Sequence, residues 1–250
     1  CATTAAACAP SVALAQSSGP IRLVIEPVDN EMIDGYICYM LAFFQDGDKP
    51  RPVLRVTEGD AVTVEVTNND YRPHAFRITG ISGATISAIP PGGTGTCSFT
   101  APVGGTYLYY DQLNGPLNRL LGLHGAFIVR PRRGTTPNNS PTPYSRVRQT
   151  AAIRAVFDAM GVPPLYPGNK WNPNDPDRDK VWLMSQTDPS LNMRVLAGET
   201  VDPATVKYAF LPRYFHINWL SGFDTAVHSG TAPEARAAAR EIMPFGRQGQ

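Results

Sequence analysis

The sequence predicts an all-β fold built as an antiparallel sandwich, and three observations support this prediction. Short runs of alternating apolar and polar residues, the pattern of half-buried strands, repeat from residue 21 to residue 131. The 250-residue chain contains 22 glycines and 24 prolines, which separate these runs as turns. Hydrophobic residues make up 42% of the chain, so a packed core is expected rather than disorder.

The expected strands follow one another along the chain at short intervals. In the run from Ala61 to Thr67, three valines would face the core while the residues between them face water. The turn EGD joins this strand to the one before it. The full set comprises IRLVIEPV from Ile21, Val53 to Val56, Ala61 to Thr67, HAFRITGI from His74, Thr96 to Phe99, Thr106 to Tyr110, and GAFIVRP, which Pro131 closes.

The charge balance gives no support to two classes of partner. Charged residues are 17% of the chain and the formal net charge is +1, so binding to nucleic acid or to a membrane surface has no electrostatic basis. No apolar run of 18 residues occurs, and no membrane span is expected.

Residues 1–16 are interpreted as a signal-peptide remnant or a disordered tail. They are small, apolar and uncharged, and Ala13 to Ala15 form an A-x-A-like cleavage site. A signal remnant predicts a periplasmic or secreted protein, from which Cys1 and Cys8 would be removed. An oxidising compartment allows Cys38 and Cys97 to pair, but sequence alone leaves open whether they do.

The second half of the chain is predicted to start another module without completing it. Residues 132–150 are polar and rich in proline, which indicates a linker. In residues 151–250, the pattern predicts a helix ending near Gly161, buried strands in KVWLMSQTD and YAFLPRYFHINWLSGF, and a short helix in TAPEARAAAREIM. Too few strands follow to close a second sandwich, so this part is expected to be a truncated domain.

The order of these motifs resembles a known family. VLRVTEGDAVTVEVTNND, HAFRITG, IPPGGTGTCSFTAPVGGTYLYY and GLHGAFIVRP together are similar to the first cupredoxin, or plastocyanin-like, domain of multicopper oxidases, and the pattern is shared with copper nitrite reductases. The resemblance implies a cupredoxin-like Greek-key β-sandwich at residues 21–131. It also implies the start of a second cupredoxin domain at residues 151–250.

The resemblance also shows where copper ligands would be expected. In the family, the first domain provides an H-x-H pair after the NN turn and a second H-x-H or an H-C pair after G-T-Y-x-Y. Here His74 holds the first position, but Phe76 and Arg77 follow it, and neither can coordinate a metal. Tyr110 stands near the next expected histidine and Asp111 follows it, so no thiolate lies there. His74 is therefore the single metal-ligand candidate. We expect His74→Ala to leave the fold intact and to cost no more than roughly 1–2 kcal/mol.

The remaining candidates have simpler interpretations. Cys97 is expected to be a core or disulfide residue, His124 a structural or surface histidine, and His216 a structural residue on a strand, while His228 lies in a polar loop. The aromatic run Tyr107, Tyr109 and Tyr110 is either a redox or binding surface or, as aromatic strand residues usually are, part of the packing.

Two functions remain open at this stage. The resemblance implies copper as cofactor and an oxidoreductase activity, which would require a C-terminal cupredoxin domain with a type-1 copper outside this chain. The alternative is a copper-free, non-catalytic cupredoxin-fold protein that binds a partner in the cell envelope. The sequence does not identify catalytic residues, and it leaves a homo-oligomer open. No G-x-S-x-G, P-loop or H-E-x-x-H motif supports another class of enzyme.

Overall fold

The computed structural model describes residues 19–32, 34–45, 49–50, 52–130, 150–152, 155 and 181–221. The predictions for the tail 1–16, for nearly all of the linker 132–150, for most of the helix before Gly161 and for TAPEARAAAREIM lie outside these residues, and the described residues 151, 152 and 155 are helical. Within the described part of the chain, no helix is long and apolar enough to cross a membrane.

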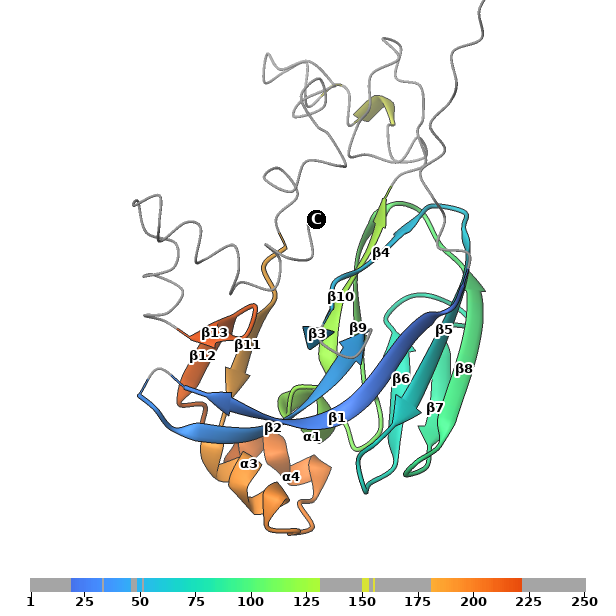
Figure 1. The fold of residues 1–250 in the computed structure, drawn as a ribbon. Helices are drawn as coiled ribbons and strands as arrows, with labels where there is room; N and C mark the ends of the chain where they lie inside the picture. The colour runs from blue at the N-terminus through green and yellow to red at the C-terminus, as the bar shows by residue number, and fades with distance from the viewer. Residues whose placement is uncertain are drawn as a thin grey trace, which may run out of the picture.

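The first part of the chain forms a sandwich of two five-stranded sheets, which confirms the predicted all-β class (Figure 1). Two strand pairs, β1 with β5 and β4 with β10, are parallel, so the sandwich is not purely antiparallel as predicted. The first sheet has the order β3 (Lys49–Pro50), β2 (Ile37–Gln45), β1 (Ile21–Glu31), β5 (Ala61–Asn68) and β8 (Thr94–Thr100). The second has the order β4 (Leu54–Thr57), β10 (His124–Arg130), β9 (Gly105–Tyr110), β6 (His74–Ile78) and β7 (Thr85–Ile89).

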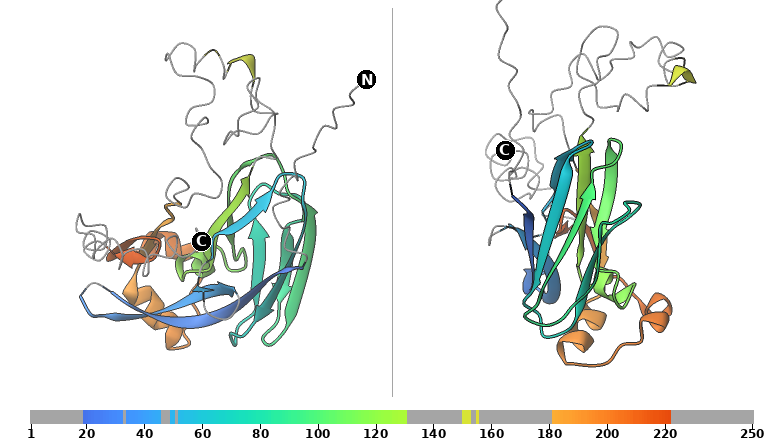
Figure 2. Two further views of the ribbon diagram at one scale, coloured as in Figure 1. Left: turned by 45° about the horizontal axis from the view of Figure 1, so that its top comes forward. Right: turned by 90° about the vertical axis from the view of Figure 1, so that its right-hand side faces the viewer.

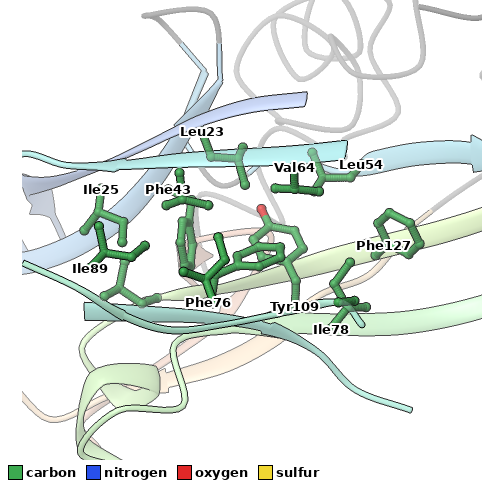
Figure 3. Close-up of a cluster of buried hydrophobic side chains, with 14 of the residues drawn as sticks. Leu23, Ile25, Phe43, Leu54, Val64, Phe76, Ile78, Ile89, Tyr109 and Phe127 are labelled. Carbon is green, nitrogen blue, oxygen red and sulfur yellow. The ribbon is translucent and has the colours of Figure 1, made fainter. Parts of the chain in front are cut away.

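Tyr109 lies at the centre of the core between the two sheets (Figure 3). Its side chain is fully buried, and its ring centroid lies 5.4 Å from that of Phe43 and 5.9 Å from that of Phe76. Its hydroxyl donates a hydrogen bond of 2.7 Å to the carbonyl oxygen of Pro52, so burial leaves no polar group unpaired there. The packing interpretation is therefore correct for this tyrosine.

Three strands of the sandwich, β2, β3 and β7, were not among those predicted from the sequence. In β2, every residue from Cys38 to Phe43 is buried, because the strand has protein on both faces. Such a strand does not show the alternation by which a half-buried strand is identified.

Of the predicted second module, residues 181–221 form a three-stranded sheet with two helices. The sheet contains β11 (Met184–Thr187), β12 (Tyr214–Ile217) and β13 (Leu220–Ser221). The prediction of one strand across YAFLPRYFHINWLSGF is wrong at its start, because α4 (Pro203–Ala209) includes its first two residues. The prediction of a buried strand in KVWLMSQTD is also wrong in part, since Trp182 and Met184 are exposed.

The β1–β2 hairpin links the sandwich to this second segment. The hairpin extends beyond the sandwich and lies beside α3 (Pro189–Leu196) and α4 (Figure 2). Asn192 of α3 donates a hydrogen bond of 2.6 Å to the carbonyl oxygen of Tyr39 in β2. At the hairpin tip, Asp34 accepts hydrogen bonds from Arg213 and from the hydroxyl of Tyr214. The hairpin therefore packs against both parts of the described chain.

Candidate functional site

A group of buried polar side chains lies at one end of the second sheet, around His74. We call Asp70, His74, Asp111 and Asn118 the His74 cluster. Their exposed fractions are 4%, 0%, 0% and 3%, so all four are withdrawn from water. Buried polar groups are costly unless they are hydrogen-bonded, and the cluster is therefore the first place to look for function.

The topology of the sheet brings these residues together. His74 is the first residue of β6, and Asp111 directly follows β9. Because β6 and β9 are antiparallel neighbours with Arg77 opposite Tyr110, the start of one strand lies beside the end of the other. Asn118 comes from the short helix α1 (Leu117–Leu120), which follows β9 in the chain.

His74 is held between two carboxylates. Its Nδ1 lies 2.7 Å from Oδ2 of Asp111, and its Nε2 lies 2.9 Å from Oδ2 of Asp70. A carboxylate oxygen accepts hydrogen bonds, so two such partners favour the imidazolium form, in which both ring nitrogens donate.

Asp111 organises the other side of the cluster. Its Oδ1 accepts hydrogen bonds from the backbone N–H groups of Ala75, at 3.0 Å, and Leu113, at 2.7 Å. Its Oδ2 accepts from His74 and, at 2.7 Å, from the side-chain amide of Asn118. Four donors on one buried carboxylate fix its position and offset the loss of hydration.

Asp70 connects the cluster toward the surface. Its Oδ2 also accepts a 3.0 Å hydrogen bond from Nε of Arg72, a residue that is partly exposed. The loop that carries both residues is shaped by the buried Asn68, whose side-chain amide donates to the carbonyl oxygens of Arg72 and Ile89. Two carboxylates and two cationic groups therefore face one another, and their formal charges cancel when His74 is protonated.

The surroundings shift the pKa values of this group in opposite directions. Burial tends to lower the pKa of His74, but its hydrogen bonds to Asp111 and Asp70 outweigh burial, and the pKa is raised. Burial tends to raise the pKa of Asp70, but the hydrogen bond from His74 and the charge of Arg72 outweigh it, and the pKa is lowered. Both shifts stabilise the charged forms.

We expect the protein to lose stability above neutral pH through His74. A histidine whose pKa is raised by folding contributes its full stabilisation below the unfolded-state pKa, about 6.5, and loses it as the pH rises through the folded-state value. Urea unfolding between pH 6 and pH 9 measures this loss. The groups facing His74 are Asp70, Asp111 and Asn118, with Arg72 and Tyr39 behind Asp70. The same series on His74→Gln is the control, and an equal slope in both proteins would contradict the prediction.

The other ligand positions expected from the resemblance are occupied by non-ligands. Phe76 is fully buried in the core, and Arg77 is exposed, 3.4 Å from Oε1 of Gln112. The ring of Tyr110 lies 6.0 Å from the guanidinium carbon of Arg119. Of the residues at the ligand positions expected from the resemblance, only His74 and Asp111 are hydrogen-bonded to each other.

The cysteines and remaining histidines lie elsewhere. Cys38 and Cys97 are free and buried, and burial raises the pKa of each thiol to about 11, so neither is a ready thiolate ligand. His124 is buried with Nδ1 3.1 Å from the carbonyl oxygen of Arg119, and His216 is buried with Nε2 3.0 Å from the hydroxyl of Thr187. His228 lies outside the described residues.

The residues present do not fit a copper centre at His74. Both ring nitrogens face carboxylates, and no sulfur atom takes part in the hydrogen bonds of the cluster. Within the described ranges, no group of three or more histidine, cysteine or acidic residues has the arrangement of a metal site. Copper prefers imidazole and thiolate donors with free lone pairs, which this cluster does not offer.

A cavity of about 650 Å³ is the second candidate site. It lies between the sandwich and the second segment, and its walls are mainly apolar. Its lining includes Leu108, Arg119, His124, Met184, Phe215 and His216. The cavity is separate from the His74 cluster, none of whose residues lines it.

Sequence reasoning missed two members of the cluster. The sequence did contain a signal for Asp70, because it is the acidic residue of the NND turn and stands four positions before the candidate histidine. Asn118 had none, because its approach depends on how α1 packs against the end of the sheet.

Comparison with known proteins shows what the sandwich is similar to. Residues 39–134 match the family model described as multicopper oxidase. The chain is 33% identical over 123 residues to a copper-containing nitrite reductase of Neisseria meningitidis, covering 46% of this chain and 31% of that protein. It is 36% identical over 101 residues to an L-ascorbate oxidase of Cucumis sativus, covering 36% of this chain and 17% of that protein. It thus spans a third or less of these curated relatives.

A solved structure shows the same fold. The blue copper oxidase of Nitrosomonas europaea superposes with a TM-score of 0.54 at 22% sequence identity, over 80% of this chain and 52% of that one. This likeness confirms the cupredoxin-like sandwich predicted from the sequence.

Proposed function

We propose that the chain, whose residues 39–134 match the family model described as multicopper oxidase, is part of a multicopper-oxidase-type oxidoreductase whose first cupredoxin domain has no copper of its own. Copper is the metal expected from the family, and the relatives named above include copper-containing nitrite reductases. In this proposal the metal is held by residues outside the described part of the chain, in a further cupredoxin domain. The first domain then serves as a rigid scaffold against which that domain packs.

The observation that carries the proposal is the closed hydrogen-bond network around His74. Nδ1 and Nε2 of the imidazole are each within 2.9 Å of a carboxylate oxygen, and the ring is fully buried. For copper to bind, His74 would have to lose a proton and one of these two partners. Removing a partner from a buried charged pair is strongly unfavourable, so the network resists metal uptake.

The alternative is a copper-free protein that binds a partner in the cell envelope. One observation is consistent with it: the face of β11 and β12 that lines the cavity carries exposed apolar side chains, with Met184 75% exposed and Phe215 59% exposed. Exposed apolar strand faces are typical of surfaces that another sheet or protein covers. The same face would serve a further domain of an oxidase, so it supports both proposals. A periplasmic or secreted location, supported by the composition of residues 1–16, belongs to either one.

Copper titration followed by NMR of the histidine rings tests the proposal on the whole 250-residue chain. At pH 6 we expect His74 to keep both ring N–H protons, and one equivalent of Cu²⁺ to leave its signals unbroadened. Bound metal is counted after gel filtration by elemental analysis. His124, which lies outside the cluster, provides the internal comparison in the same spectrum. Selective loss of the His74 signals together with one tightly held copper would contradict the proposal.

A further inference from the structure

The cavity between the sandwich and the second segment has the size and composition of a small-molecule site. Its volume of about 650 Å³ lies within the range of pockets that enclose a small ligand. Residues of β9, α1 and β10 line one side, and residues in and next to β11 and β12 line the other. A few polar side chains in a largely apolar lining are what such sites use to orient a ligand.

The apolar walls come from both parts of the described chain. Leu108 alternates with the core residue Tyr109 in β9, so it points to the outer face of the second sheet. Met184 and Ile217 are directly opposite each other on β11 and β12, so they share one face of that sheet. The other apolar lining residues are Leu120, Leu183 and Phe215. These side chains are mostly non-aromatic and either branched or flexible, so they match an acyl chain better than a stacked planar ring.

An arginine without an ionic partner lies at this cavity. Arg119 of α1 lines the cavity and is exposed, with its guanidinium carbon 6.0 Å from the centre of the Tyr110 ring. In the part of the chain that the structure describes, no carboxylate forms an ion pair with it. By contrast, Arg72, Arg194 and Arg213 each lie within 3.0 Å of a carboxylate oxygen. The Arg119 guanidinium is therefore available to an anionic ligand, and its planar fork matches a single carboxylate.

A buried hydroxyl in the cavity wall also lacks a partner. Ser185 lines the cavity, and its Oγ is shielded from solvent without a hydrogen bond to any atom of the described residues. Leaving a buried hydroxyl unpaired costs free energy. Rotation about one bond can turn Oγ toward the cavity, where an oxygen atom of a ligand would provide the missing partner.

We infer that this cavity binds a single-chain aliphatic carboxylate, such as the anion of a medium-chain fatty acid. The acyl chain lies between the apolar walls, the carboxylate binds the Arg119 guanidinium, and Ser185 is a further donor to the carboxylate. A neutral molecule with the same chain gains the apolar contacts but not the ionic one. Because the cavity and the His74 cluster share no residue, the inference does not depend on whether the chain is part of an oxidase.

Calorimetric titration of the whole 250-residue chain with decanoate at neutral pH tests the inference, and 1-decanol is the neutral probe. We expect one decanoate per chain and weaker binding of 1-decanol. Arg119→Gln should weaken decanoate binding about tenfold, because a hydrogen-bonded charge pair is lost, and should leave 1-decanol binding unchanged. Ser185→Ala should weaken decanoate binding about fivefold, the scale of one hydrogen bond.

Two further variants show whether the carboxylate is bound in this cavity. Arg22→Gln is the matched control, since it removes an exposed arginine from β1 in the first sheet, and it should bind decanoate as the wild type does. Met184→Glu places a negative charge on a lining residue that is 75% exposed, so the fold should persist while decanoate binding is lost. Circular dichroism of each variant checks that it is folded.

Equal decanoate affinity in the wild type and Arg119→Gln would overturn the inference, and so would 1-decanol binding as tightly as decanoate. In either case apolar surface alone would account for the uptake. Decanoate binding that persists in Met184→Glu would place the ligand elsewhere and would also refute it. No binding to the folded wild-type chain would refute it as well, and would leave the cavity as a surface on which another part of the protein packs.

Discussion

Gly125→Ala is expected to destabilise the sandwich by about 3 kcal/mol, the upper part of the range for overpacking a core. A methyl group at this position would overlap the ring of Tyr109, which lies directly opposite on β9. Tyr109 cannot move aside easily, since it is fully buried against Phe43 and Phe76 and its hydroxyl is bonded to Pro52. Urea unfolding of the two proteins measures the difference.

Gly105→Ala is the matched control for this prediction. Gly105 lies in the same pair of strands, opposite Val129, but a methyl group there would meet the Tyr107 ring at an ordinary contact distance of 3.5 Å. We expect it to be neutral or slightly stabilising, because alanine has less freedom to lose on folding than glycine. A similar loss in both variants would mean that backbone effects, and not the Tyr109 contact, decide the result.

His74→Ala is expected to cost about 3–5 kcal/mol, the scale for leaving buried charges without their partner. The sequence alone predicted an intact fold and a cost of no more than roughly 1–2 kcal/mol, the usual scale of point substitutions. The structure changes that expectation, because the variant would leave the carboxylates of Asp70 and Asp111 buried without the cation between them. Urea unfolding near pH 6, where the imidazolium contributes most, is the appropriate measurement.

A double-mutant cycle separates the charge effect from the loss of packing. Asp70→Asn removes one of the two negative charges while keeping the size of the side chain. We expect His74→Ala/Asp70→Asn to be less destabilised than the sum of the two single variants, since the second change removes a charge that the first leaves unpaired. Strict additivity would show that His74 acts through its volume alone.

The sandwich was predictable wherever one face of a strand meets water. In β5, Val62, Val64 and Val66 alternate with exposed or half-exposed residues, as the sequence indicated. In β2 the pattern is absent, because both faces are covered. The covering layer includes α3, whose contact with β2 depends on residues more than 150 positions away, such as Asn192 on Tyr39. No local pattern carries that information.

The candidate site was predictable only in part for a related reason. His74 and Asp111 follow motifs of the family, so their positions could be identified from spacing. Their direct contact required knowing that β6 and β9 are neighbours, and the contribution of Asn118 required the placement of α1. The sequence thus predicted which ligands are missing, but the network that fills their place depends on tertiary structure.

The two buried cysteines described above should be chemically inert while the chain is folded. Cys38 and Cys97 lie in the interior without a disulfide, and their thiols stay protonated up to strongly alkaline pH. Oxidants and alkylating reagents act on accessible thiolates, so neither should modify Cys38 or Cys97 in the folded protein. Passage through an oxidising compartment would then leave these two sulfurs unchanged as long as the chain stays folded, and their sudden reactivity would report unfolding.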